Sequence, residues 1–553
     1  MTRVDASPPE VHSTTTPRSA VRMRGPVALY LLLVLAAYPF YRFLIGPDAI
    51  SYISIARHYA RGEWSEAFNP YWSPLLSWLI APLLALRVPG LLAAKIVCIL
   101  SGLGALWSLR RLVRVLGLSR LLGSAVLYAA AVMLSSFALV WITPDLLSAA
   151  IVLYYFSVLF SPRYLDERKA GLLCGLIGAI AYLSKAYNFY FFLAHFTVVS
   201  VILWARSRGP EHRRAFHHFA AGLILFVVCC APWIAIVTVR AHTLTVGDAG
   251  EWNLRLVGPN SPGFPQFYHL IPPSSPHAIS MWENPSPSLL PRWNPFSSVG
   301  NLRHEARLIA TNLRGILEIL NHASLFAFTA LFAYFIWGLS RPSTGRSLWL
   351  LMLTSIAILP AGYVLVTLRD RYVWDDRYLW AGMFLVMLAA FLVIQAVGRG
   401  LSPLARNIAA VVCALSFAAT PLLDLLHKRT TGHEVYGAGL ALKNEIPAGS
   451  RFASCGQWND GIAIAYYLNA HFYGSTGITG EEKEFRSILN PNPNLTGVPE
   501  QLTPAEIAQS LRDYRIEYFL ILPDCSVKPA QDILSHPVEV PGRPDLKLYR
   551  VSD

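Results

Sequence analysis

Charged residues and cysteines are both scarce in this chain. Asp, Glu, Lys and Arg make up 14% of its 553 residues, where a soluble domain usually carries about 25%. A chain so poor in charge and 54% hydrophobic does not fit a soluble globule. Only seven cysteines are present, which argues against a disulfide-rich secreted scaffold. No convincing internal repeat is present either.

Long apolar runs take the place of the missing charge. Eleven stretches are each long enough to cross a hydrocarbon core about 30 Å thick. We expect spans near residues 26–45, 91–108, 122–141, 146–161, 170–187, 188–205, 219–239, 321–339, 347–367, 378–397 and 407–424. The sequence therefore predicts a mainly α-helical, polytopic transmembrane bundle of about 11 spans.

Arginine is concentrated in the short loops on one side of these spans. One such loop holds Arg110, Arg111, Arg114 and Arg120, whereas the opposite side holds long segments rich in aspartate and tryptophan. The positive-inside rule then places the N-terminus in the cytoplasm, and an odd number of spans places the C-terminus outside. The net charge of +13 reflects this bias and attraction to anionic lipids. We expect a multi-pass protein of the cytoplasmic (inner) membrane, and no nucleic-acid partner, because the arginines are spread over many loops.

The chain divides into three expected parts. Residues 1–25 are rich in Ser, Thr and Pro and are expected to form a disordered cytoplasmic tail. The transmembrane domain is expected over 26–424, with a first outer loop at 46–90 and a long outer loop at 240–321. An extracytoplasmic domain is expected over 425–553.

The first outer loop carries apolar side chains at helical spacing. Ile50, Ile53, Ala56 and Tyr59 recur in this way, and a second such stretch covers 74–86. Patterns of this kind predict amphipathic helices lying in the membrane interface.

Strand-like and helix-like stretches alternate in the last 120 residues or so. Apolar β-prone runs at 451–455, 471–475, 518–523 and 546–551 alternate with helical stretches near 436–446, 460–469 and 503–515. This alternation predicts a small α/β layer domain. Cys455 and Cys525 are the two cysteines outside the spans, and they are disulfide candidates, with two free thiols as the equal alternative.

Two aspartates stand at the outer ends of spans. Asp48 follows Pro47 at the exit of the first span, and Asp145 follows Pro144 at the start of a later one. The capping interpretation is that Asp48 caps a helix by accepting from free backbone N–H groups. At the second site Thr143 would be the cap, with Pro144 at the first helical position. The catalytic interpretation is a general base, or a carboxylate that orients a hydroxyl. Two carboxylates at one membrane level could also hold a divalent cation such as Mg or Mn, although two ligands are too few to predict a metal.

Cationic side chains are expected on the same side. Lys185 ends the fifth span, where a lysine can extend to the interface or neutralise a phosphate group. Segment 369–380 is the densest polar cluster between two spans, and it breaks the positive-inside rule. Its Arg371 and Arg377, with Tyr378 beside them, suit phosphate oxygens. The alternative for this segment is internal Arg–Asp pairing within an aromatic belt.

Aromatic residues of the outer loops could stack on sugar rings, although tryptophans also anchor proteins at membrane interfaces. The candidates for acceptor or sugar binding are Tyr52, Arg57, Trp72, Trp252, His269 and Trp282.

Several separated motifs together resemble one family. They are Pro47-Asp48 with Tyr52, Ala56-Arg57 and Gly62, then Tyr71-Trp72-Ser73-Pro74-Leu75, Thr143-Pro144-Asp145, Leu183-Ser184-Lys185 and Asp376-Arg377-Tyr378-Leu379. In their order over residues 26–400 they resemble the GT-C membrane glycosyltransferases, specifically the protein O-mannosyltransferase and lipid A aminoarabinose transferase type.

The resemblance implies an enzyme that takes a sugar from a polyprenyl-phosphate donor. It implies inverting transfer to a protein, lipid or glycan acceptor on the outer face of the membrane. It further implies that Asp48 orients or deprotonates the acceptor, that Lys185 and Arg377 hold the donor phosphate, and that Asp145 supports the site. Ala49 stands where many relatives carry a second acid. The alternative is a transporter or flippase, or a polymer-assembly protein, for lipid-linked glycans.

Overall fold

The computed structural model describes residues 21–261, 264, 266, 269–287, 290–340, 346–366, 376–476, 502–525, 533–534 and 536–551. Arg371 and most of the expected N-terminal tail lie outside these residues, so neither prediction has a structural counterpart.

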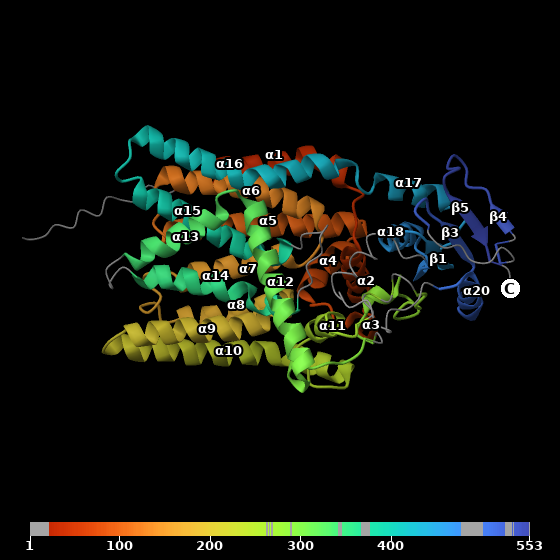
Figure 1. Cartoon of the computed structure of the whole chain (residues 1–553), viewed down its shortest axis with the longest axis horizontal. Coiled ribbons are helices and arrows are strands. Elements are labelled where there is room, and N and C mark those ends of the chain that lie inside the picture. The colour runs from red at the N-terminus through yellow and green to blue at the C-terminus, as the bar shows by residue number, and fades with distance from the viewer. Residues whose placement is uncertain are drawn as a thin grey trace, which may run out of the picture.

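Long apolar helices form the body of the molecule. Those that are long and apolar enough to cross a membrane number eight among the described residues. They are α1 (Arg24–Tyr41), α5 (Gly90–Val115), α6 (Arg120–Val140), α9 (Tyr187–Arg206), α10 (Pro210–Ala241), α14 (Arg346–Val366), α15 (Trp380–Val397) and α16 (Pro403–His427). Figure 1 shows them side by side along the long axis, with a small sheet at one end. The chain is therefore a multi-pass membrane protein with a mainly helical fold.

Three of the eleven expected spans are not single helices long enough to cross a membrane. Two are too short, and one is bent. α7 (Asp145–Leu159) and α8 (Ala170–Ser184) have 15 residues each. That length is about 22 Å of helix, less than the hydrocarbon core of about 30 Å. The third, near 321–339, belongs to α12 (Val299–Ala323) and α13 (Ala327–Leu339), which meet at a bend of 103°.

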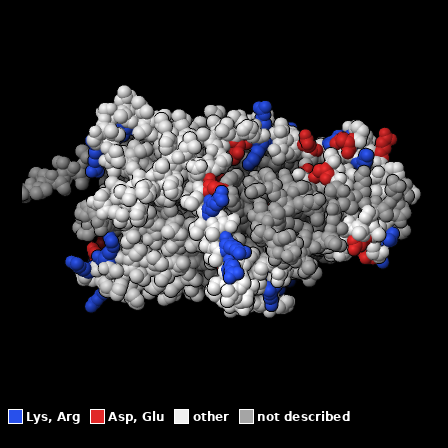
Figure 2. Space-filling model, in the orientation of Figure 1, with Lys and Arg blue, Asp and Glu red and all other residues white. Residues whose placement is uncertain are grey.

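α12 was expected to be part of an irregular outer loop, and it is instead a helix of 25 residues. It lies across the direction of the other helices in Figure 1, and basic side chains follow its length in Figure 2. Further basic side chains lie at the end of the bundle away from the sheet, with uncharged surface between. α12, in the long outer segment, is therefore the helix whose orientation and basic side chains resemble those of an interfacial helix.

The first outer loop folds into α2 (Pro47–Arg61), α3 (Trp64–Ala67) and α4 (Leu75–Ala85). Every residue from 49 to 56 is buried, so protein covers α2 on all sides and it does not lie open in an interface. Its polar side chains find partners inside the protein: the Ser51 hydroxyl donates to the Trp282 carbonyl at 3.1 Å. The helical spacing of apolar residues therefore belongs to a buried helix here. Its polar side chains form hydrogen bonds with other parts of the protein and not with water.

The C-terminal residues form the expected α/β domain. Its strands are β1 (Arg451–Cys455), β2 (His471–Ser475), β3 (Tyr518–Ile521), β4 (His536–Val538) and β5 (Lys547–Arg550), and its helices are α17 (His433–Leu442), α18 (Trp458–Leu468) and α20 (Pro504–Asp513). The sheet order is β2-β1-β3-β5-β4, parallel across the first three strands and antiparallel across the last three. β4 was not expected, because His536–Val538 is short and contains a proline. Cys455 and Cys525 are joined by a disulfide, with their Cα atoms 4.9 Å apart.

The long outer segment connects this domain to the bundle. It contains α11 (Ala249–Leu256) and the 3-10 turns η2 (Met281–Glu283) and η3 (Pro295–Ser297); η5 (Asp376–Leu379) and η6 (Lys428–Thr430) are further short turns near α15 and α16. The Phe472 N–H of β2 donates to the Ile279 carbonyl at 2.6 Å, and the Ile271 N–H donates to the Tyr473 carbonyl at 2.6 Å. One apolar cluster runs from α2 and α4 into α18 and the sheet. The outer segments and the C-terminal domain therefore form one packed unit over the bundle.

Candidate active site

Asp48 is held at the first turn of α2 by side chains from two distant parts of the chain. Gly46 is the N-cap and Pro47 takes the first helical position, so the Asp48 carboxylate does not cap the helix. Its Oδ1 accepts a hydrogen bond from the Trp282 indole Nε1 at 3.1 Å, and its Oδ2 lies 2.9 Å from Arg377 Nη1. The carboxylate is thus fixed through both of its oxygens.

Asp145 and Lys185 form an ion pair between the start of α7 and the end of α8. α7 begins at Asp145, but its N-cap is Pro144 and no side chain caps it, so the expected cap by Thr143 does not form. Arg377 Nε lies 4.0 Å from the second oxygen of Asp145, whose side chain is 4% exposed. Two cations therefore neutralise a buried carboxylate.

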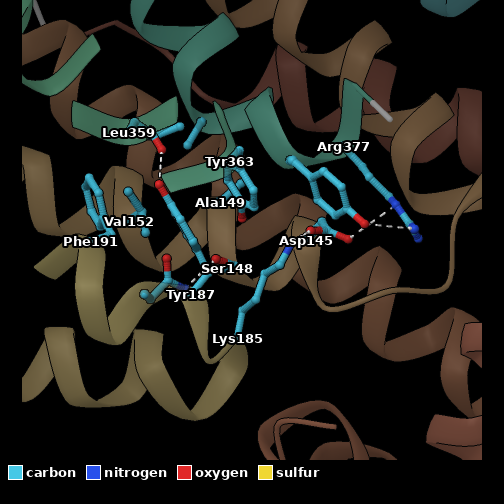
Figure 3. A pocket seen from close by; sticks show the side chains of 13 residues that line it. Asp145, Ser148, Ala149, Val152, Lys185, Tyr187, Phe191, Leu359, Tyr363 and Arg377 are labelled. Atoms are coloured by element: carbon cyan, nitrogen blue, oxygen red, sulfur yellow. Dashed lines mark hydrogen bonds and ion pairs between the residues drawn. The ribbon is translucent and has the colours of Figure 1, made fainter. Parts of the chain in front are cut away.

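These contacts make an alternating series of charges, Asp48–Arg377–Asp145–Lys185, contributed by α2, η5, α7 and the end of α8. Figure 3 shows Asp145 between Lys185 and Arg377. The bounds of two short helices explain the contact between Asp145 and Lys185. α7 begins at Asp145 and α8 ends just before Lys185, so the start of one helix lies beside the end of the other.

Three stacked tyrosines form the wall beside Lys185. The ring centroids of Tyr187 and Tyr363 are 3.9 Å apart, and those of Tyr363 and Tyr378 are 5.0 Å apart. Lys185 Nζ lies 3.9 Å from the Tyr378 ring centroid, a cation–π contact that orients the ammonium group. Tyr187 and Tyr363 were not predicted as site residues. The only sequence signal for them is the position of Tyr187 two residues after Lys185.

A narrow cavity with a free volume of about 20 Å³ lies against this cluster, between α7, α9, α14 and α15. Its charged wall consists of Asp145, Lys185 and Arg377, and its apolar wall includes Val152, Phe191, Leu359 and Ala381. In Figure 3 the charged side chains lie on one side of the view, and Phe191, Val152 and Leu359 lie on the other. The cavity therefore has one charged end, and its remaining wall is mainly apolar and aromatic, with the hydrogen-bonded Ser148 and Asn188 as polar members.

The aromatic candidates of the outer loops gather behind Asp48. The Trp72 indole donates to the Trp282 carbonyl at 3.0 Å, and the rings of Tyr52 and Trp72 are 5.0 Å apart. Trp252 meets Trp282 edge to face at 5.4 Å. Burial raises the pKa of Tyr52 well above its ordinary value, and the nearby carboxylates of Asp48 and Asp145 raise it further. The Tyr52 hydroxyl therefore stays protonated.

Two predicted residues lie elsewhere. The Arg57 guanidinium stands 5.2 Å from the Tyr466 ring of α18, at the contact between α2 and the C-terminal domain. The His269 carbonyl faces Gly474 at the end of β2. Neither side chain is among the residues that line the charged cavity.

A buried polar contact closes the bundle beneath the cavity. The two ring nitrogens of His195 lie 2.9 Å from the Tyr155 hydroxyl and 2.7 Å from the Ser355 hydroxyl. All three residues are buried, and they join α7, α9 and α14. The sequence analysis missed this contact, since a histidine within an apolar run gives no sign of its partners.

No group of three or more His, Cys, Asp and Glu side chains that could hold a metal ion occurs in the part of the chain that the structure describes. The carboxylates of Asp48 and Asp145 each contact arginine or lysine there. Either acid would have to exchange such a contact in order to ligate a cation.

No protein-family model and no curated protein matches the chain. Solved structures do resemble it in fold. ArnT from Cupriavidus metallidurans bound to undecaprenyl phosphate is 16% identical, with 96% of this chain and 98% of that chain covered and a TM-score of 0.49. The oligosaccharyltransferase AglB from Archaeoglobus fulgidus, in complex with an inhibitory peptide and a dolichol-phosphate, is 10% identical, with 90% and 69% covered and a TM-score of 0.48.

The arabinofuranosyltransferase AftD from Mycobacteria is 16% identical, with 97% of this chain and 40% of that chain covered and a TM-score of 0.46. All three are GT-C membrane glycosyltransferases. Because every TM-score is below 0.5, an activity has to be argued from the site itself.

Proposed function

We propose that this chain is an integral membrane glycosyltransferase. It moves a sugar from a polyprenyl-phosphate donor to a protein, lipid or glycan acceptor, with inversion, on the outer face of the cytoplasmic membrane. The observation that carries the proposal is the charged cavity. Lys185 and Arg377 stand at its charged end, and the rest of its wall combines apolar side chains with three tyrosines and the hydrogen-bonded pair Ser148 and Asn188. A ligand with an anionic head and a hydrocarbon tail matches both parts of this wall.

The charge cluster supplies what the reaction requires. An acceptor hydroxyl attacks the anomeric carbon, its proton passes to the Asp48 carboxylate, and the bond between carbon and phosphate oxygen breaks. The electron pair of that bond stays on the phosphate, whose growing negative charge is met by Lys185 and Arg377. Fixed cations stabilise this charge more in the transition state than in the ground state, and that difference accelerates the reaction.

The ion pairs of the structure also suit a site awaiting its donor. The forked guanidinium of Arg377 now contacts Asp48, and the ammonium group of Lys185 contacts Asp145. A donor phosphate would compete with these carboxylates, since its oxygens accept the same hydrogen bonds. Binding of the donor would then release Asp48 toward the acceptor. Asp145 would keep Lys185 oriented.

Replacement of Asp48 by asparagine tests this proposal. Asp48→Asn keeps the shape and the contact to Trp282 but removes the base, so transfer should fall by about 100-fold to 10,000-fold. The measurement is mass spectrometry of envelope glycans and glycoproteins from cells with wild-type protein, with the variant and with no protein. Asp166→Asn is the matched control, because Asp166 pairs with Arg214 on the exposed surface.

We expect cells with Asp48→Asn to match cells without the protein, and cells with Asp166→Asn to match wild type. Unimpaired transfer by a membrane-inserted Asp48→Asn protein would contradict the assignment of the base. A transporter of lipid-linked glycans would also retain its activity in this variant, so the same experiment separates the two functions.

A further inference from the structure

A second cavity, separate from the charged one, opens between the first outer loop and the long outer segment. It has a volume of about 400 Å³, within the range of about 300–1,000 Å³ typical of small-molecule sites. Its polar lining residues include His58, Glu66, Asn69, Arg240, Ser275 and Glu283. We call this cavity the outer cleft.

The lining of the outer cleft is rich in hydrogen-bonding groups and is not strongly charged. His58 already pairs with Glu63 at 2.7 Å, which leaves one guanidinium opposite two carboxyl groups. An anion would be repelled by Glu66, and a purely apolar ligand would leave these groups without partners. A ligand with many hydroxyl groups satisfies both kinds of side chain, because each hydroxyl both donates and accepts.

Two buried groups on one wall support a polar ligand. Glu283 is 4% exposed, and one of its carboxyl oxygens accepts from the Ile279 N–H at 2.6 Å. The amide oxygen of its neighbour Asn284 is buried and has no hydrogen-bond partner among the described residues. An unpartnered buried oxygen is costly, and a donor group from a ligand would offset that cost.

One aromatic residue lines the outer cleft, and tryptophans pack behind it. Phe68 lines it, and its ring lies 6.1 Å from that of Trp64 and 6.2 Å from that of Trp233 at the outer part of α10. Trp64 is 57% exposed, and Trp78, 36% exposed, also contacts Trp233. Exposed tryptophans of this kind are typical of the membrane interface, so the cleft opens near headgroup level.

Asp48 stands between the two cavities. One carboxylate oxygen contacts Arg377, which lines the charged cavity, and the other contacts Trp282, whose neighbour Glu283 lines the outer cleft. We propose that the outer cleft binds a saccharide, the glycan portion of the acceptor. Calling this saccharide the acceptor rests on the proposed function, whereas the binding of a saccharide does not.

Direct binding measurements test the inference. The full-length protein in lipid nanodiscs is titrated calorimetrically with maltose, α-1,2-mannobiose and chitobiose, each free and as its dodecyl glycoside. The test variant is Glu66→Ala with Ser275→Ala. Both positions are partly exposed, so these substitutions leave the buried core unchanged. The matched control is Glu251→Ala with Ser297→Ala, the same substitutions in the long outer segment but outside the cleft.

We expect at least one of these sugars to bind wild type and control alike, and to bind the test variant at least 10-fold more weakly. Tighter binding of the dodecyl glycoside would identify a glycolipid as the source, and equal binding would identify a free glycan. Failure of all six probes to bind wild type, or equal binding by the test variant, would overturn the inference. A protein that binds these sugars but transfers none would contradict the proposed function and leave the cleft assignment standing.

Discussion

Four charged side chains, Asp48, Arg377, Asp145 and Lys185, share one small volume, and none is more than 23% exposed. Taking charges out of water costs several kcal/mol for each ion, and apolar replacements of a buried ion pair are often as stable. Stability is therefore a weak reason for such a cluster. A reaction in which negative charge moves from a hydroxyl to a phosphate is a stronger one.

The phosphate role of Arg377 can be separated from the rest of the cluster. Arg377→Ala should raise the KM for a polyprenyl-phosphate donor by about 10-fold to 100-fold, the value of one or two hydrogen bonds between charged groups. The KM for the acceptor should change much less. Initial rates at varied concentrations of each substrate give both constants.

Two further variants control for this change. Arg377→Lys keeps the charge but loses the planar fork, so it should recover donor binding only in part. Arg292→Ala removes an arginine of the long outer segment that is 77% exposed, and it should leave both constants near wild type. Equal effects of Arg377→Ala on donor and acceptor would argue against a phosphate role.

Glu283 makes stability depend on pH. Burial raises its pKa from 4.5 to about 7. The protonated form is therefore favoured in the folded state, and the stabilisation is fully present below pH 4.5 and is lost as the pH rises through about 7. At about 1.4 kcal/mol for each pKa unit, the loss amounts to roughly 3 kcal/mol.

Glu283→Gln should remove this dependence, because glutamine stays neutral. The melting temperature of wild type should fall by a few degrees relative to the variant between pH 5 and pH 8. Burial also raises the pKa of Asp460, to about 6, but that contribution is common to both proteins and cancels in the difference. Parallel melting curves over this range would contradict the assigned pKa.

At the scale of elements, the turn η2 contacts the first outer loop and the C-terminal domain at once. The Trp282 carbonyl of η2 accepts bonds from Ser51 of α2 and from the Trp72 indole, while its own indole holds Asp48. On the other side its ring meets Trp458 of α18 at 6.2 Å. Trp282 therefore acts as a positioning residue for the proposed base.

Trp282→Phe tests that role. The substitution keeps an aromatic ring and the backbone contacts but removes the N–H that binds Asp48, so kcat should fall about 10-fold, while the KM for the donor stays the same. Trp293→Phe is the matched control, since the Trp293 indole, in the same segment, donates to the Leu254 carbonyl and not to an acid. Equal losses in both variants would indicate a general effect on folding.

Element positions were largely predictable where the pattern is local. Runs of apolar residues located the long spans, and alternating stretches located β1, β2, β3 and β5 of the C-terminal sheet. What periodicity could not predict depends on contacts between distant segments. The burial of α2 follows from its cover by η2 and α18, and the contact between Asp145 and Lys185 follows from the points at which α7 begins and α8 ends.

The site shows the same division. Helix-end positions on one side of the membrane brought Asp48, Asp145, Lys185 and Arg377 together as expected, because span ends on one face share a depth. Arg57 carried the same kind of signal, yet it lies against the C-terminal domain. Which way a side chain on a buried helix points depends on packing, and a single sequence does not contain that information in a readable form.

At the scale of the whole molecule, the C-terminal domain packs against the long outer segment that contacts Asp48. β2 pairs with residues near 271 and 279 of the long outer segment, a few residues before Trp282. The Cys455–Cys525 disulfide lies in the same domain and requires an oxidising compartment. Both observations are consistent with a C-terminus outside the cytoplasm, on the same side as Asp48.

Reporter fusions test this arrangement. Alkaline phosphatase, which folds only in an oxidising compartment, should be active when it is fused after residue 553 and inactive when it is fused after a basic loop at residue 118. A single cysteine placed at the exposed position Glu539 should react with a membrane-impermeant thiol reagent in intact cells. Ser119→Cys, on the arginine-rich side, should react only after the membrane is opened. Labelling of the cysteine at position 539 only after the membrane is opened would place the charged cavity away from the outer face, and transfer to an outer acceptor would then be impossible.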